Sequence, residues 1–177
     1  MITSTTWTAP TPASLDGPLV GDDRPMLQAY LGWQRSALLN ICAGLTGEQL
    51  GARPLATSNL SLLGLVRHMT KVERTWFRIR AAGEDVAPVF DPALGKDHDF
   101  NALDPVRAPQ DFARYDEECR CSVATAASMS FDDTFTFEPD GRPFSLRMVY
   151  VHMIGEYARH NGHADLLREA LDGQTGR

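Results

Sequence analysis

Four long stretches with helical periodicity constrain the fold of this chain more than any other feature of its sequence. Apolar residues recur at steps of three or four, the spacing of one helical face, over residues 25–45, 61–83, 109–129 and 145–171. Amphipathic helices of about 20 residues bury their apolar faces against one another in a four-helix bundle. The pattern therefore predicts an all-α fold.

Residues that start and stop helices flank these stretches. Pro25 suits a first helical position, where its missing N–H costs nothing. Ser61 and Ser145 suit N-caps, because a serine hydroxyl accepts a hydrogen bond from a backbone N–H of the first turn. Gly83 and Gly173 follow the last periodic residues of their stretches, where helices often end.

The segments between the helices predict three further features. Thr46 is suited to cap a short turn at "TGEQL". Residues 84–108 form a long loop between the second and third helices, and long loops often act as lids or binding loops. In residues 133–145, polar and apolar side chains alternate for a few positions, and "PDG" then marks a turn. This pattern predicts a small irregular hairpin before the fourth helix.

Length and composition fit a single domain without a nucleic-acid or membrane partner. The 177 residues carry a formal net charge of −6 and no block of Lys or Arg, so no basic footprint for nucleic acid is expected. No apolar run approaches the roughly 18 residues of a membrane span. Residues 1–22 are polar and lack a signal-peptide pattern, so we expect a flexible arm there. Residues 23–177 are expected to form the bundle domain. The three cysteines are few and scattered, which favours a cytoplasmic protein with free thiols. An apolar helix face could join two copies of the chain, so a homodimer is a further possibility.

The segment "HMIGEYARHNGH", residues 152–163, places four ionisable side chains on one helical face. On a helix, Glu156, His160 and His163 lie within about 80° of His152. Apolar residues share this part of the surface, so the face points toward the bundle interior. Buried ionisable groups are costly unless they are paired or bound to a metal ion.

A fifth residue, His68, lies on the inward face of the second predicted helix. Glu156 and His160 are four residues apart, a spacing that lets two side chains bind one ion. With His68 they form a set of two histidines and one carboxylate, which leaves coordination positions for water or a substrate. The alternative is a group of hydrogen-bonded core side chains, and the residues alone leave both open. His98, in the polar loop segment "GKDHDF", is expected to be solvated and not a ligand.

Two stretches also resemble a known family: "LLGLVRHMTKVERTWF", residues 62–77, and "SLRMVYVHMIGEYARHNGHADLLREALDG", residues 145–173. They are similar to the DinB-like superfamily of metal-binding four-helix bundles, which includes YfiT-type proteins. Within it, the chain resembles the actinobacterial branch of mycothiol-dependent transferases, over residues 26–176.

The resemblance implies a ligand set. In this superfamily one ligand comes from the second helix and two, four residues apart, come from the fourth, which matches His68, Glu156 and His160. Many members carry three histidines, whereas the mycothiol-linked maleylpyruvate isomerase branch has Glu in the middle position, as this chain does. His163 stands where many relatives have Gln, so it is not carried over as a ligand.

The resemblance and the ligand pattern together predict a divalent-metal-dependent thiol S-transferase of detoxification. Zinc is the expected ion, and mycothiol, or another low-molecular-weight thiol, is the expected co-substrate that is conjugated to an electrophile. His152 and His163 are candidates to orient the ligands or relay a proton. Arginines that could meet the thiol co-substrate or form ion pairs lie on the two ligand-bearing helices: Arg67, Arg74, Arg159 and Arg168.

Two other functions stay open at this point. One is a hydrolase that uses metal-activated hydroxide, with His152 or His163 as proton acceptor. The other is a non-catalytic metal-binding stress protein, whose closed site would need a fourth protein ligand such as His163.

Overall fold

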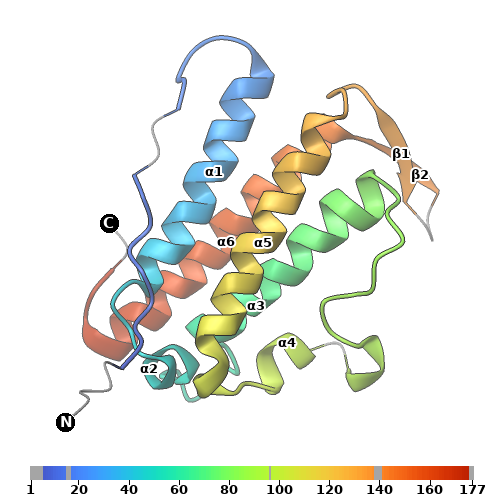
Figure 1. Ribbon diagram of the computed structural model, residues 1–177. Coiled ribbons are helices and arrows are strands. Elements are labelled where there is room, and N and C mark those ends of the chain that lie inside the picture. Colours follow the sequence, from blue (N-terminus) through green and yellow to red (C-terminus); the bar gives the residue numbers. More distant parts are fainter. Residues whose placement is uncertain (1–5, 15–16, 96, 138–140, 176–177) are drawn as a thin grey trace.

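The computed structural model describes residues 6–14, 17–95, 97–137 and 141–175, which fold mainly into long helices packed side by side (Figure 1). These helices are α1 (Asp23–Cys42), α3 (Leu62–Glu73), α5 (Ala108–Ala127) and α6 (Leu146–Asp172). A π-helical segment, η1 (Arg74–Ala81), continues α3, so the second predicted helix is present but ends in a wider winding. The predicted four-helix bundle is confirmed. α1 packs along α6, and α3 packs along α5.

The starts of α3 and α6 follow the predicted caps, whereas α1 begins two residues before Pro25, at Asp23. The hydroxyl groups of Ser61 and Ser145 accept hydrogen bonds of 3.1 and 3.2 Å from the backbone N–H three residues further on. Each bond satisfies an N–H that has no partner inside its helix. Thr46 forms a reciprocal capping box at the start of α2 (Gly47–Gly51). Gly173 ends α6 at φ 77°, where a residue with a Cβ would be strained.

Two short strands, β1 (Thr134–Phe137) and β2 (Arg142–Ser145), pair antiparallel before α6 and confirm the predicted hairpin. Phe144 of β2 packs edge-on against Trp76 of η1, with ring centroids 5.8 Å apart. The turn predicted at "PDG" begins outside the described residues.

The loop between η1 and α5 is long, as predicted, but contains three short helical segments: η2 (Pro92–Leu94), α4 (His98–Asn101) and η3 (Pro105–Arg107). In Figure 1 the loop returns from the end of η1 toward the start of α3. There α4 packs against α3, and Phe100 stacks on the ring of His68 with centroids 5.1 Å apart. The loop is therefore anchored on a candidate metal ligand.

The apolar faces predicted from periodicity form the core. Leu31 and Leu38 of α1 and Met69 of α3 are fully buried, as is Met153 of α6. The helical spacing also predicts that Val123 lies on the inward stripe of α5 with Phe112 and Tyr115, and this is wrong, because Val123 is 54% exposed. Its neighbour Ser122 occupies the inward position instead.

A buried polar network connects the four long helices. Arg35 of α1 donates two hydrogen bonds, 2.8 and 2.7 Å long, to the carboxylate of Glu73 on α3. Tyr157 of α6 donates to the same carboxylate at 2.7 Å, and its hydroxyl lies 3.0 Å from that of Tyr115 on α5. Glu73 is completely buried, so its charge depends on Arg35 for compensation.

Part of the predicted N-terminal arm packs on the bundle. Ala9 is buried, and its backbone N–H donates to Leu45 O at 2.8 Å. Trp7 meets Phe112 of α5 edge-on, with ring centroids 5.4 Å apart. The boundary between an arm, residues 1–22, and a domain, residues 23–177, stays a prediction.

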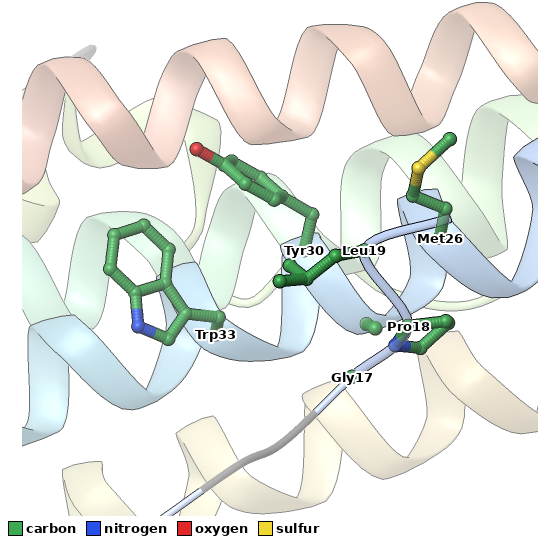
Figure 2. A pocket seen from close by; sticks show the side chains of 7 residues that line it. Gly17, Pro18, Leu19, Met26, Tyr30 and Trp33 are labelled. Atoms are coloured by element: carbon green, nitrogen blue, oxygen red, sulfur yellow. The ribbon is translucent and has the colours of Figure 1, made fainter.

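Further along the arm, a cavity of about 310 Å³ lies between residues 17–19 and α1 (Figure 2). A Cβ atom on Gly17 would lie 2.2 Å from Cβ of Ala29, so glycine is needed where the arm touches the helix. The cavity wall includes Tyr30 and Trp33, which are about half exposed.

The described helices bear on two other predictions. None of them is long and apolar enough to cross a membrane. Exposed apolar side chains occur on α1 at Tyr30 and Trp33 and on α6 at Val151 and Leu166. Whether such faces join two copies of the chain stays a prediction.

Candidate metal centre

The three side chains predicted as metal ligands converge between α3 and α6. His68 comes from α3, and Glu156 and His160 come from successive turns of α6. One potential ligand atom of each lies within 4.8 Å of the other two, and no other group of three or more such side chains was found among the described residues. Oε1 of Glu156 is 3.6 Å from Nε2 of His68 and 3.3 Å from Nε2 of His160. This donor set suits a divalent transition-metal ion.

The ring of His68 is held so that one nitrogen faces the other candidate ligands. Its Nδ1 lies 2.8 Å from Oδ2 of Asp99. Because a carboxylate only accepts, Nδ1 donates in this bond, and in the neutral imidazole Nε2 then offers a lone pair. Nε2 is buried without a hydrogen-bond partner, which costs free energy. A metal ion would satisfy this nitrogen, so the residues present fit a bound cation.

Asp99 is the residue of this site that the sequence analysis missed. It is 1% exposed, and its Oδ2 also lies 2.5 Å from Nζ of Lys71. Arg67 donates to its backbone oxygen at 3.0 Å, which fixes α4 on α3. Burial alone would raise the pKa of Asp99, but hydrogen bonds from His68 and Lys71 outweigh burial and hold the pKa at about 2. The carboxylate is therefore ionised at neutral pH and can orient His68 as a ligand.

One signal in the sequence could have pointed to this contact. Phe100 is an apolar residue in a polar stretch, and it is buried where the loop meets α3. Asp97 of the same stretch is exposed, as a solvated loop predicts. His98 is half-buried, lies edge-on to Phe90 with centroids 6.0 Å apart, and is outside the ligand cluster.

His163 contacts Nδ1 of His160, as Asp99 contacts Nδ1 of His68. Its Nδ1 is 3.4 Å from Nδ1 of His160, a long hydrogen bond. If Nδ1 of His160 donates in this bond, its Nε2 is free to face Glu156. The pKa of His160 is lowered to about 4, mainly by burial and also by the nearby His68 and His163. A neutral imidazole is the form that binds a metal ion.

His152 lies one turn before Glu156 on α6, and its ring contacts that of Trp76 of η1 at a tilt of 42°, with centroids 4.1 Å apart. Burial lowers the pKa of His152, and Arg80 adds to this effect, whereas the negative charge of Glu156 opposes it. His152 is therefore a neutral base beside the candidate ligands. Like His163, it does not belong to the converging ligand cluster.

Comparison with known proteins identifies the family to which this site belongs. A family model described as Mycothiol-S-transferase matches residues 26–173. The chain belongs to the mycothiol-S-transferase family. The match spans both ligand-bearing helices and the loop that carries Asp99. No curated protein and no solved structure matches the chain.

The family match confirms the resemblance seen in the sequence, because the mycothiol-S-transferase family is DinB-like. The family name implies a transferase whose thiol substrate is mycothiol.

The arginines on the ligand-bearing helices mostly make structural contacts. Arg67 donates to Asp111 at 3.2 Å, and Arg74 pairs with Glu118 on α5. Arg168 donates to Ile41 O at 2.6 Å, at the end of α1. Arg159 is exposed on α6. The three structural arginines thus hold helices and loop together around the site.

The cysteines of this family member are unsuited to act as the nucleophile. Burial raises the pKa of both Cys42 and Cys119 to about 12, so both thiols stay protonated at neutral pH. Cys121 lies on the outer part of α5, 3.4 Å from a carboxylate oxygen of Glu117, and its pKa is also raised, mainly by burial. None of the three cysteines therefore offers a ready thiolate at neutral pH.

Proposed function

We propose that this protein is a divalent-metal-dependent thiol S-transferase that conjugates mycothiol to an electrophilic small molecule. The observation that carries the proposal is the buried Nε2 of His68, which has no hydrogen-bond partner and faces Glu156 and His160. The family name implies mycothiol as the thiol substrate, and an ion bound by these three residues would activate this thiol.

His68, Glu156 and His160 would hold the ion, and we propose zinc. Two imidazoles and one carboxylate bind zinc in catalytic sites and leave a position open for substrate. A divalent cation in this place would lower the pKa of an incoming thiol, so that the sulfur reacts as a thiolate at neutral pH.

The surrounding side chains have distinct parts in this reaction. Asp99 and His163 orient the imidazoles of His68 and His160 through the hydrogen bonds described above. His152 is neutral and lies one turn from Glu156, which makes it the candidate acceptor for the thiol proton. The sulfur then forms a bond to the electrophilic carbon, and a leaving group departs or a double bond takes up the electron pair.

Glu156 would moderate the charge of a bound ion. As an anionic ligand it leaves less net positive charge on an ion than a third histidine would. The weaker charge should ease departure of the sulfur from the ion once its new bond has formed. The site is also partly open, with Glu156 exposed over 25% of its side chain, which fits turnover better than a closed structural site.

Conjugate formation tests the proposal. Zinc-loaded protein should accelerate the reaction of mycothiol with monochlorobimane, and a chelator or the His160→Ala substitution should abolish the acceleration. Glutathione and bacillithiol serve as comparison thiols. If no thiol reacts faster while zinc is shown to be bound, the transferase is refuted, and a hydrolase or a non-catalytic metal protein becomes the better account.

A further inference from the structure

A cavity of about 470 Å³ opens between the α3–η1 helix and the loop that precedes α5. This volume is in the usual range of small-molecule sites, about 300–1,000 Å³. The residues that matter for its chemistry come from both sides: Lys71, Thr75 and Ile79 from the helix, and Phe90, Asp91 and Asp99 from the loop.

The cavity adjoins the candidate metal centre through Asp99, although none of the three candidate ligands lines it. Asp99 lines the cavity and hydrogen-bonds His68. Lys71, Thr75 and Ile79 follow His68 at steps of three or four residues, so they continue the helix face that carries this ligand. The cavity lies on the Nδ1 side of the His68 ring, so a thiol bound in it has to extend past this ring for its sulfur to reach the proposed ion.

The lining suits a neutral ring with many hydroxyl groups. Phe90 and Ile79 supply apolar walls against which a ring can pack. Lys71 has three N–H donors, one of which Asp99 occupies, and the Asp91 carboxylate can accept more than its one bond from Ala93 N. A sugar hydroxyl group both donates and accepts hydrogen bonds, so it can pair with the Lys71 ammonium and with the Asp91 carboxylate. Asp91 and Asp99 line the cavity beside the basic side chains of Lys71 and His98, so neither sign of ligand charge is strongly favoured.

We infer that this cavity binds the sugar portion of the thiol substrate, while the sulfur reaches the metal centre. The inference rests on the proposed function, since it takes a sugar-bearing thiol as the substrate. It assigns the cavity to the thiol and not to the electrophile. Lys71, Asp99 and Thr75 would then contact the sugar whether or not turnover occurs. The affinity for the sugar can therefore be measured apart from catalysis.

Two substitutions test this assignment against a matched control. Thr75→Val removes a hydroxyl group at nearly constant shape, and Ile79→Trp reduces the space inside the cavity. Thr70→Val is the control, because the Thr70 hydroxyl makes the same bond to the carbonyl four residues earlier, 2.8 Å in both cases, but does not line the cavity. Circular dichroism and bound zinc confirm that each variant is folded and metal-loaded.

The probe is the sugar portion of mycothiol without its thiol, titrated calorimetrically into the protein. We expect about three- to tenfold weaker binding in Thr75→Val, the effect of one lost hydrogen bond. Binding should be lost in Ile79→Trp and unchanged in Thr70→Val. KM for mycothiol should rise in the two cavity variants, while KM for N-acetylcysteine, a thiol without sugar, stays the same.

The inference is overturned if Thr75→Val and Ile79→Trp bind the sugar as the wild type does. It is also overturned if these variants change the affinity for the electrophile and not for the sugar. Absence of turnover with every thiol would refute the proposed function alone, because the calorimetric experiment does not depend on catalysis.

Discussion

Replacing Asp99 by alanine should weaken zinc binding by about 100-fold, and replacing it by asparagine should weaken it by about tenfold. Alanine removes the acceptor that lies 2.8 Å from Nδ1 of His68. The imidazole is then free to rotate, or to carry its proton on Nε2, and in both cases it binds a cation poorly. Asparagine still accepts from Nδ1 but has no charge to strengthen the ligand. The two losses correspond to about 2.8 and 1.4 kcal/mol.

The structure indicates that the loop survives these changes. Arg67 holds the backbone oxygen of residue 99, which every variant keeps. Phe100 stays stacked on His68 in all of them. Lys71 is 33% exposed and can be hydrated when its partner is removed. A loss of affinity can therefore be assigned to the missing contact with His68.

Competition with a chromogenic chelator at neutral pH measures the zinc dissociation constant of each variant, and ¹⁵N NMR reports which nitrogen of His68 carries the proton. Asp97→Asn is the matched control, because Asp97 lies in the same loop but is exposed and makes no side-chain cap. Wild-type affinity in a folded Asp99→Ala variant would show that His68 needs no support from the loop, and the reasoning would be wrong.

Four further predictions concern the site and the core. His160→Ala should lose stoichiometric zinc in elemental analysis while staying folded, and unchanged stoichiometry would remove this residue from the site. In the metal-free protein, the pKa of His160 is lowered from 6.5 to about 4, chiefly by burial. The unfolded chain therefore binds a proton more readily, so stability should fall as the pH drops from 6.5 toward 4, and thermal melts of His160→Gln should show a smaller fall. Arg35→Met should lower the free energy of unfolding, measured in urea, by about 3–5 kcal/mol, because it leaves the buried charge of Glu73 without compensation. A change below about 1 kcal/mol, the value of an exposed ion pair, would contradict this prediction. His98→Ala should keep full zinc stoichiometry, and its loss would mean that the loop contributes a ligand.

The sequence by itself determined the helices and the candidate ligand set. Periodicity, N-caps such as Ser61 and Ser145, and the C-terminal Gly173 all act between residues a few positions apart, so they can be read without a structure. The same holds for Glu156 and His160, which one helix turn brings together. His68 followed from the inward face of its helix and from the family resemblance.

Only the tertiary structure decided what surrounds these ligands. Asp99 meets His68 across 31 residues of chain, and this contact depends on how the loop docks through Phe100 and Arg67. Glu73 pairs with Arg35 in the core because α1 and α3 meet there, 38 residues apart in sequence. Such contacts depend on how whole helices and loops pack, which no local pattern encodes. The sequence could therefore name the candidate ligands, but not the carboxylate that orients His68 or the cavity beside it.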